Sequence, residues 1–253
     1  MLLTLDIHIH SCLSPCGSPD MTPRNIAAMA ALCGLTAFAV SDHNTCRQCP
    51  PVMAAAAEHG LLAIPAMELT TSEEAHVLCL LPDLGAAAAF SDYVYERLPD
   101  IANRPEIFGE QTVMDRHDRP AAEERRLLLS ATSISVYGVS ELAESFGGMA
   151  IPAHIDRPSF SVLSNLGLWD AAWGFKAFEA GDPESVPGLR ARFPELAALR
   201  YVSNSDAHTL EGLGAARPGT LEAERPDARA VIDALKRGQT RKPNIQGGST
   251  CPT

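Results

Sequence analysis

Two histidines lie two residues apart near the start of the chain, inside a short apolar segment. His8 and His10 alternate with Ile7 and Ile9, and this pattern predicts a buried strand. Side chains two residues apart on a strand point to the same face, so the two imidazoles should converge. Neutral imidazole binds zinc, manganese or iron, so the pair would supply half of a metal site. The alternative is a pair of surface histidines on the first strand.

Further residues that commonly bind metals lie at the ends of other short apolar segments. Most come directly after such a segment, whereas His76 comes at the start of one. The additional candidates are His43, Glu68, His76, His154, Asp206 and His208. The spacing of Asp206 and His208 repeats that of the first pair, so the last strand is expected to face the first. Eight candidates, with three or four protein ligands per catalytic ion, predict about two or three divalent ions.

Strand and helix patterns alternate along the chain, which is typical of parallel β–α–β units in an α/β protein. The predicted strands cover residues 2–9, 37–40, 61–66, 76–81, 149–153, 175–179 and 201–203. The clearest predicted helices cover residues 23–33, 51–59, 183–193 and 227–237. In parallel α/β barrels the functional groups lie at the carboxyl ends of the strands, where nearly all of the candidates fall.

The regular alternation is interrupted between residues 85 and 147. This segment predicts a helix near residues 90–98, a polar-tipped hairpin over 108–126 and a helix over 139–146. We interpret residues 85–147 as an insertion, because their apolar content is too thin for a separate core.

The length and composition of the chain bound the number of domains. A chain of 253 residues, 46% of them hydrophobic, can bury a sizeable core, and α/β barrels of this length are commonly one domain. We therefore expect one domain over residues 1–240. Residues 241–253 contain paired glycines and two prolines, so we expect a loosely ordered tail there.

The charge balance and the cysteines limit the expected partners and compartment. The formal net charge is −11 and no basic stripe is present, which argues against nucleic acid bound through its backbone and against an anionic membrane. No signal peptide and no apolar segment of bilayer length is visible, so a cytoplasmic protein is expected. Without an export signal, the seven cysteines are expected to be thiols rather than a disulfide framework.

The motifs together resemble the PHP (polymerase and histidinol phosphatase) family. The matching segments are Asp6-x-His8-x-His10, Ser41-Asp42-His43-Asn44, Glu68 with His76, Pro152-Ala153-His154 and Asn204-Ser205-Asp206-Ala207-His208. They occur in the family's order and cover about residues 1–210, nearly the whole chain. The resemblance implies a distorted (β/α)7 barrel with a di- or trinuclear site of zinc, manganese or iron, in a family that consists mostly of phosphoesterases.

The resemblance also distributes the candidate ligands over three metal positions. The resemblance implies that the first metal position is bound by His8, His10, Glu68 and Asp206. The second position would be bound by Glu68, His76 and His154, and the third by His43 and His208. Many family members add an Asp or His from the loop after the first histidine pair, whereas this chain offers Cys16 and, further on, Asp20. A cysteine ligand at the third position would favour a thiolate-tolerant ion such as zinc or iron.

Three further residues near these motifs are candidates for supporting roles. Asp6 and Asp42 either orient the neighbouring histidines or cap backbone amides, and the sequence leaves both interpretations open. Arg157 follows His154 by three residues and is a candidate phosphate clamp, because a guanidinium can donate two parallel hydrogen bonds to phosphate.

The cysteine pair Cys46-x-x-Cys49 has a second interpretation. It follows His43, while Cys12 and Cys16 follow His10, so all four thiols could meet at one rim. Such pairs can form a structural zinc site, and a CxxC pair can also be redox-active.

The combined pattern predicts a metal-dependent phosphoesterase that acts on a small phosphorylated substrate. Glu68 is expected to bridge two ions, because each of its carboxylate oxygens can bind one. Metals lower the pKa of a bound water to about 7, and the hydroxide would attack phosphorus while Arg157 stabilises the charge. A water molecule or His208 would protonate the leaving group. The alternatives are a metal-dependent hydrolase of C–N (amide) bonds and a non-catalytic, metal-held regulatory domain.

Overall fold

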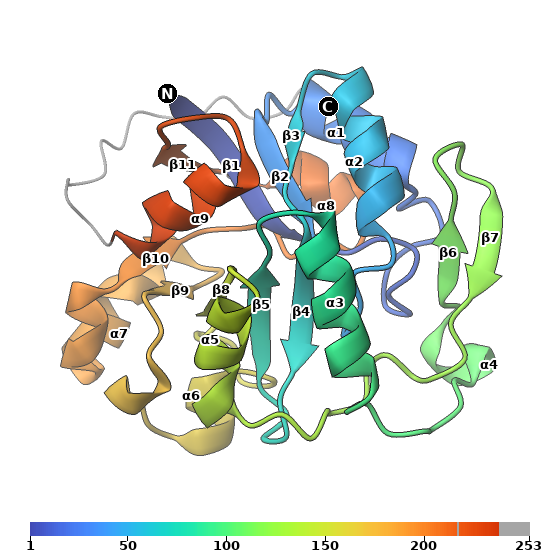
Figure 1. Ribbon diagram of the computed structural model, residues 1–253. Coiled ribbons are helices and arrows are strands. Elements are labelled where there is room, and N and C mark those ends of the chain that lie inside the picture. The colour runs from blue at the N-terminus through green and yellow to red at the C-terminus, as the bar shows by residue number, and fades with distance from the viewer. Residues whose placement is uncertain (217, 238–253) are drawn as a thin grey trace.

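The computed structural model describes residues 1–216 and 218–237, so the predicted tail over 241–253 lies outside the described residues (Figure 1). Strand β1 (Leu2–Ile9) lies inside a four-stranded sheet of order β11-β1-β2-β3. It pairs in parallel with β2 (Ala37–Val40), which pairs in parallel with β3 (Leu62–Ala63). On its other side β1 pairs antiparallel with β11 (Gly219–Glu222).

The remaining strands form three smaller sheets. Their bounds are β4 (Ala66–Thr70), β5 (His76–Leu80), β6 (Thr112–Met114), β7 (Pro120–Glu123), β8 (Met149–Pro152), β9 (Ala177–Glu179) and β10 (Arg200–Val202). An antiparallel sheet has the order β4-β5-β8, and β9 and β10 form a parallel pair. The hairpin of β6 and β7 lies inside the segment where the sequence predicted it.

The α/β class is as predicted, but the strands of the described chain form separate sheets rather than one closed (β/α)7 barrel. Part of the difference lies at β4 and β5, which are antiparallel and connected only by residues 71–75. Parallel neighbours need a crossover of about a dozen or more residues, so this short connection imposes a hairpin. It also places the start of β5 beside the end of β4, which explains why His76 begins a strand.

Isolated backbone contacts connect the separate sheets at the end where the candidate ligands gather. Ile9 bridges Ala207, and His43 bridges Glu68, both in parallel orientation. Beyond the end of β8, the amide of Ile155 donates a hydrogen bond to the carbonyl of Glu179 at 2.9 Å. These contacts bring the ends of strands from different sheets to one place.

The helices are arranged around these sheets (Figure 1). They are α1 (Pro23–Leu32), α2 (Cys49–Glu58), α3 (Leu84–Tyr95), α4 (Pro105–Phe108), α5 (Val136–Ser145), α6 (Val162–Leu166), α7 (Val186–Arg192), α8 (Leu210–Ala215) and α9 (Ala228–Lys236), with short 3-10 helices over Ala171–Trp173, Pro183–Ser185 and Pro194–Ala198. The start of α1 is as predicted, because Thr22 accepts a hydrogen bond from the Asn25 amide and Pro23 follows it. None of the described helices combines the length and the apolarity needed to cross a membrane.

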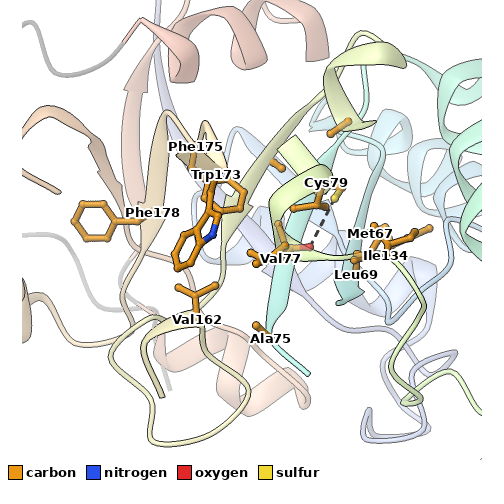
Figure 2. Close-up of a cluster of buried hydrophobic side chains, with 14 of the residues drawn as sticks. Met67, Leu69, Ala75, Val77, Cys79, Ile134, Val162, Trp173, Phe175 and Phe178 are labelled. Atoms are coloured by element: carbon orange, nitrogen blue, oxygen red, sulfur yellow. Dashed lines mark hydrogen bonds between the residues drawn. The ribbon is translucent and has the colours of Figure 1, made fainter. Parts of the chain in front are cut away.

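Side-chain alternation along β4 separates the apolar core from the candidate site. Met67 and Leu69 belong to a buried cluster that also contains Cys79 and Trp173 (Figure 2). Successive side chains of a strand point to opposite faces, so Glu68 points away from this cluster. The core on one face of β4 therefore fixes the position of the carboxylate on the other.

The insertion packs against the loop that follows β1. Its own buried apolar cluster consists of Leu98, Val113 and Leu128, and it is completed by Leu13 from that loop. The contact is close at Gly109, where an added Cβ would lie 2.0 Å from the carbonyl oxygen of Pro15. The insertion thereby supports the loop after β1. The single domain predicted over residues 1–240 stays a prediction.

We predict that Gly109→Ala destabilises the fold more than Gly34→Ala does. Both glycines have a positive φ (+102° and +72°), but a Cβ on Gly34 would meet nothing within 4 Å. Gly34→Ala should therefore cost only the left-handed backbone conformation, about 1–2 kcal/mol. Gly109→Ala should cost about 1–3 kcal/mol more because its Cβ clashes with Pro15. Urea denaturation gives both free energies of unfolding, and equal losses would contradict the close contact.

Candidate metal centre

The pairing of β1 with β2 is irregular in the stretch that carries the two histidines, between Asp6 and Ile9. Ile7 belongs to the buried cluster that contains Leu3 and Leu5 of β1, whereas Ile9 belongs to a second cluster with residues of α1 and α2. His8 and His10 alternate with Ile7 and Ile9, so they point away from these apolar clusters, and both are fully buried.

Five imidazoles surround the carboxylate of Glu68, which is itself almost completely buried. Oε1 of Glu68 lies 3.1 Å from Nε2 of His8, 3.0 Å from Nδ1 of His76 and 3.2 Å from Nε2 of His154. Oε2 lies 3.3 Å from Nε2 of His10 and 3.1 Å from Nδ1 of His43. Residues from five different parts of the sequence thus meet at one carboxylate, and the two oxygens contact different imidazoles.

One part of this cluster has the dimensions of a tetrahedral metal site. His8 Nε2 and His10 Nε2 lie 3.3 Å apart, and Asp206 Oδ1 lies 3.2 Å from the first and 3.1 Å from the second. Four atoms bound tetrahedrally to zinc at about 2.0–2.1 Å are separated by about 3.3–3.4 Å. Together with an oxygen of Glu68, these atoms could hold an ion after only small shifts.

Buried polar atoms without hydrogen-bond partners also fit a bound ion. Nδ1 of His43 and Oδ1 of Asp206 are both buried and lie 3.1–3.2 Å from other groups of the cluster, but neither atom makes a contact with hydrogen-bond geometry. Unsatisfied buried polar groups are rare in folded proteins, and a missing ion is one of their ordinary explanations. Because imidazole and carboxylate are good ligands for zinc, manganese and iron, the residues present fit a divalent transition metal.

The carboxylates and imidazoles shift one another's pKa values. Burial lowers the pKa of His10, but the adjacent carboxylates of Asp206 and Glu68 outweigh this effect and raise the pKa to about 9. Burial raises the pKa of Glu68, but attraction to the surrounding imidazoles, led by His76, holds it well below its usual range. The cluster therefore contains buried negative charge that requires protons or metal ions as its counterpart.

Two of the candidate ligands have a strained backbone. The φ angle is +30° at His154 and +50° at Asp206. Residues other than glycine rarely adopt positive φ, and such strain persists where the surrounding structure fixes a particular geometry, often at a functional site.

The candidates form further groups whose ligand atoms lie within 4.8 Å of one another. One group consists of His43, Glu68 and His76, and another consists of His10, Cys16, His43 and His208. For the second metal position the resemblance implied Glu68, His76 and His154. The first of these groups contains His43 in place of His154, although His154 also contacts Glu68. The second contains Cys16, whereas Asp20 is exposed and belongs to none of the groups found among the described residues.

Asp42 fixes the loop that carries Cys16. Its carboxylate accepts hydrogen bonds from the Ser11 amide at 2.8 Å, the Ser11 hydroxyl at 2.6 Å and the Ser14 hydroxyl at 2.7 Å. Oγ of Ser14 lies 3.0 Å from Nδ1 of His10. Because the Ser14 proton is donated to Asp42, Ser14 accepts the Nδ1 proton of His10 and leaves Nε2 free for an ion. Asp42 thus reaches His10 through Ser14.

Asp6 contacts backbone rather than a ligand imidazole. Its Oδ1 accepts hydrogen bonds from the His8 amide at 3.2 Å and from the Ser205 amide at 3.3 Å. Burial raises the pKa of Asp6 to about 6. The contacts match the backbone-capping interpretation, and they join β1 to the segment that precedes Asp206.

The four-cysteine zinc site is not assembled among the described residues. Sγ of Cys46 and Sγ of Cys49 are buried and each lies 3.4 Å from the carbonyl oxygen of Ala66. Neither of them, nor Cys12, belongs to a group that could hold a metal in the described part of the chain. The pair instead belongs to the buried apolar cluster around β4.

Arg157 and His208 lie at the edge of the cluster. The Arg157 guanidinium contacts a carboxylate oxygen of Asp206 and is half-exposed. It lines a cavity of about 320 Å³ that also reaches His154 and Asp206. The ring of His208 is 33% exposed and stacks on that of His10, with centroids 4.3 Å apart. Both side chains are therefore accessible beside the candidate ligands.

Glu179 contacts the cluster but was missed in the sequence analysis. It is almost completely buried, and its two oxygens lie 3.1 and 2.9 Å from Nδ1 of His8. Because an ionised carboxylate only accepts hydrogen bonds, Nδ1 of His8 carries a proton and Nε2 is left free for an ion. The available signal was its place at the end of the strand predicted over residues 175–179, as for most other candidates.

We predict that Glu179→Ala weakens metal binding about 10–100-fold, because His8 loses the partner that fixes its tautomer and orientation. Glu179→Gln keeps an acceptor oxygen and should lose less. Glu184→Ala removes an exposed glutamate nearby in the sequence and serves as the control. Competition titrations against a chelator give the metal dissociation constants, and an unchanged constant in Glu179→Ala would refute this role.

Comparison with known proteins places the fold. No family model and no curated protein sequence matches the chain. The lesion-specific endonuclease PfuEndoQ from Pyrococcus furiosus matches with 22% identity and a TM-score of 0.69, over 96% of this chain and 57% of that chain. A candidate metal-dependent phosphoesterase from Bifidobacterium adolescentis matches with 21% identity and a TM-score of 0.61, over 93% of this chain and 96% of that chain. An amidohydrolase from Chromobacterium violaceum matches with 20% identity and a TM-score of 0.56, over 81% of this chain and 88% of that chain.

These matches correct one conclusion drawn from charge. The expectation that nucleic acid is an unlikely backbone-bound partner is wrong, because an Endonuclease Q with a similar fold, at a TM-score of 0.67, is solved with a 27-mer duplex that carries an abasic lesion. A formal net charge describes the whole chain and does not report the local surface at a site. The chain spans 57–58% of the length of the two endonuclease chains. The shared fold and the His and Glu cluster support the resemblance to the PHP family.

Proposed function

We propose that this chain is a metal-dependent phosphoesterase that holds two or three divalent ions of zinc, manganese or iron. The observation that carries the proposal is the buried carboxylate of Glu68, whose two oxygens contact different imidazoles. This arrangement suits a carboxylate that bridges two ions, and paired ions are typical of phosphoryl-transfer sites. When bound, such ions would polarise the phosphoryl oxygens and lower the pKa of a water molecule.

The roles of the accessible residues follow from their places at the edge of the cluster. Arg157 would bind a non-bridging phosphate oxygen, because its half-exposed guanidinium contacts Asp206 and lines the adjacent cavity. His208 would donate a proton to the leaving oxygen.

Two alternatives remain distinct from this proposal. One matching structure is named an amidohydrolase, which keeps C–N hydrolysis as a rival reaction. Inhibition by inorganic phosphate would favour the phosphoesterase. A non-catalytic domain would need no access to its metals, whereas here a cavity of about 320 Å³ reaches His154 and Asp206.

A phosphodiester in a nucleic acid is a second candidate substrate. It is favoured by the fold shared with endonuclease structures, one of which holds lesion-containing duplex DNA. The assay should therefore compare small phosphomonoesters with a 27-mer duplex that contains one abasic site.

We predict that the purified protein carries at least two equivalents of transition metal. Cys16→Ser should lower the content by about one equivalent, because serine replaces a thiolate poorly, and Cys46→Ser should leave it unchanged. Elemental analysis after purification without chelator measures all three proteins. One equivalent or less in the unmodified protein would refute the multinuclear site. Equal losses in both cysteine variants would instead indicate a structural zinc site.

We also predict that Glu68→Gln abolishes turnover while the fold stays intact. The amide keeps the side-chain volume but loses the negative charge that would hold two cations. Initial rates on the substrate panel with added Mn²⁺, together with circular dichroism, measure both properties. Substantial activity with unchanged metal content would show that Glu68 is not the bridge.

A further inference from the structure

Phe160 is an exposed aromatic side chain that is held against the candidate metal centre. Its ring is stacked on that of His76, with the centroids 5.0 Å apart and the planes at 17°. Its carbonyl also accepts a hydrogen bond from the His76 amide at 2.9 Å. His76 in turn contacts Glu68, so Phe160 is one residue removed from the carboxylate at the centre of the cluster. Despite these contacts, Phe160 is 50% exposed.

The backbone at Phe160 is in a conformation that bulky residues avoid. Its φ angle is +53°, in the left-handed region, where an aromatic residue is an outlier and glycine or asparagine is usual. The loop is held in this shape from one side by Ser161, whose hydroxyl donates to the carbonyl of Arg157 at 3.0 Å. An exposed apolar ring on a strained backbone gains little from burial, so its position beside the cluster calls for another explanation.

The cavity beside the cluster differs in chemistry from Phe160, which lies in the same loop as Arg157 but is not one of the residues that line the cavity. The cavity beside the cluster is lined by charged and polar residues that include Asp156, Arg157 and Asp182. A phosphate group suits Arg157 and the metal ligands, but these residues offer no flat surface to an organic ring. Phe160 offers one, since His76 can cover only one of the two faces of its ring.

We propose that Phe160 is a stacking platform for a planar heteroaromatic group of the substrate, such as a nucleobase. The proposal rests on the proposed phosphoesterase function and narrows its substrate class to phosphate esters that carry a flat ring. Bases stack on aromatic side chains whatever their sequence identity, whereas a bare sugar phosphate gains nothing comparable. The ring would lie on Phe160 while the phosphate reaches the metal ligands and Arg157.

A matched pair of substrates isolates this contact. A nucleoside 5′-monophosphate and ribose 5-phosphate share the same phosphoribose and differ only in the base. The unmodified protein, loaded with Mn²⁺, should show at least about tenfold higher kcat/KM for the nucleotide. Phe160→Leu should remove most of this preference through KM and leave ribose 5-phosphate within about twofold. Phe160→Trp should retain the preference.

Tyr137→Leu is the matched control, because Tyr137 is also an exposed aromatic residue but contacts Trp173 instead of the cluster. A Phe160→Leu variant that loses activity equally on both substrates, together with metal, would overturn the platform and leave Phe160 as a support for His76. Equal kcat/KM values for the two substrates in the unmodified protein would overturn it as well.

Calorimetric binding separates this proposal from the proposed function. If the metal-loaded protein hydrolyses no phosphoester at all, the phosphoesterase proposal fails. Binding of the two compounds then still decides the role of Phe160. Tighter binding of the nucleotide that is lost in Phe160→Leu and kept in Phe160→Trp supports the platform, and equal binding of both compounds refutes it.

Discussion

The candidate site depends on one buried carboxylate. An ionised Glu68 away from water would be strongly unfavourable without positive charge beside it, and five imidazoles provide the positions where protons or metal ions can supply that charge. Because the five imidazoles come from four separate segments of the chain, with His8 and His10 sharing β1 and its end, the requirement links segments that are far apart in the sequence. Removing the charge of Glu68 would therefore affect the two ligand groups that contain it, and through His10 and His43 it would also reach the group with Cys16.

The rest of the architecture serves to hold those rings in place. Separate sheets are joined by single bridges at Ile9 and His43, so the strand ends are fixed where the ligands project. Glu179 and Ser14 each bind the outer ring nitrogen of a histidine and direct the inner nitrogen to the cluster. The strained backbone of Asp206 shows that the fold tolerates an unfavourable conformation to keep a carboxylate at this place.

Much of the site could be predicted from the sequence, because its residues follow apolar segments whose strand character is readable from composition. The convergence of His8 and His10 could be predicted because side chains two residues apart on a strand point to the same face. The register shift between Asp6 and Ile9 could not be read, since a bulge is set by pairing with β2. Glu179 was missed because a single acidic residue at a strand end has no partner in the local sequence. A closed barrel is not found among the described strands, where the antiparallel β4–β5–β8 sheet departs from the parallel β–α–β pattern. The expectation that nucleic acid is an unlikely partner was wrong because net charge is not local.

The most direct test of the account is an X-ray structure with anomalous data collected above and below the absorption edge of the metal found by elemental analysis. The account predicts at least two anomalous peaks, one bound by Oε1 and the other by Oε2 of Glu68. His8, His10 and Asp206 should surround one peak, and His43 or His76 should bind another. A single peak, or peaks that do not contact Glu68, would contradict the bridging carboxylate on which the account is built.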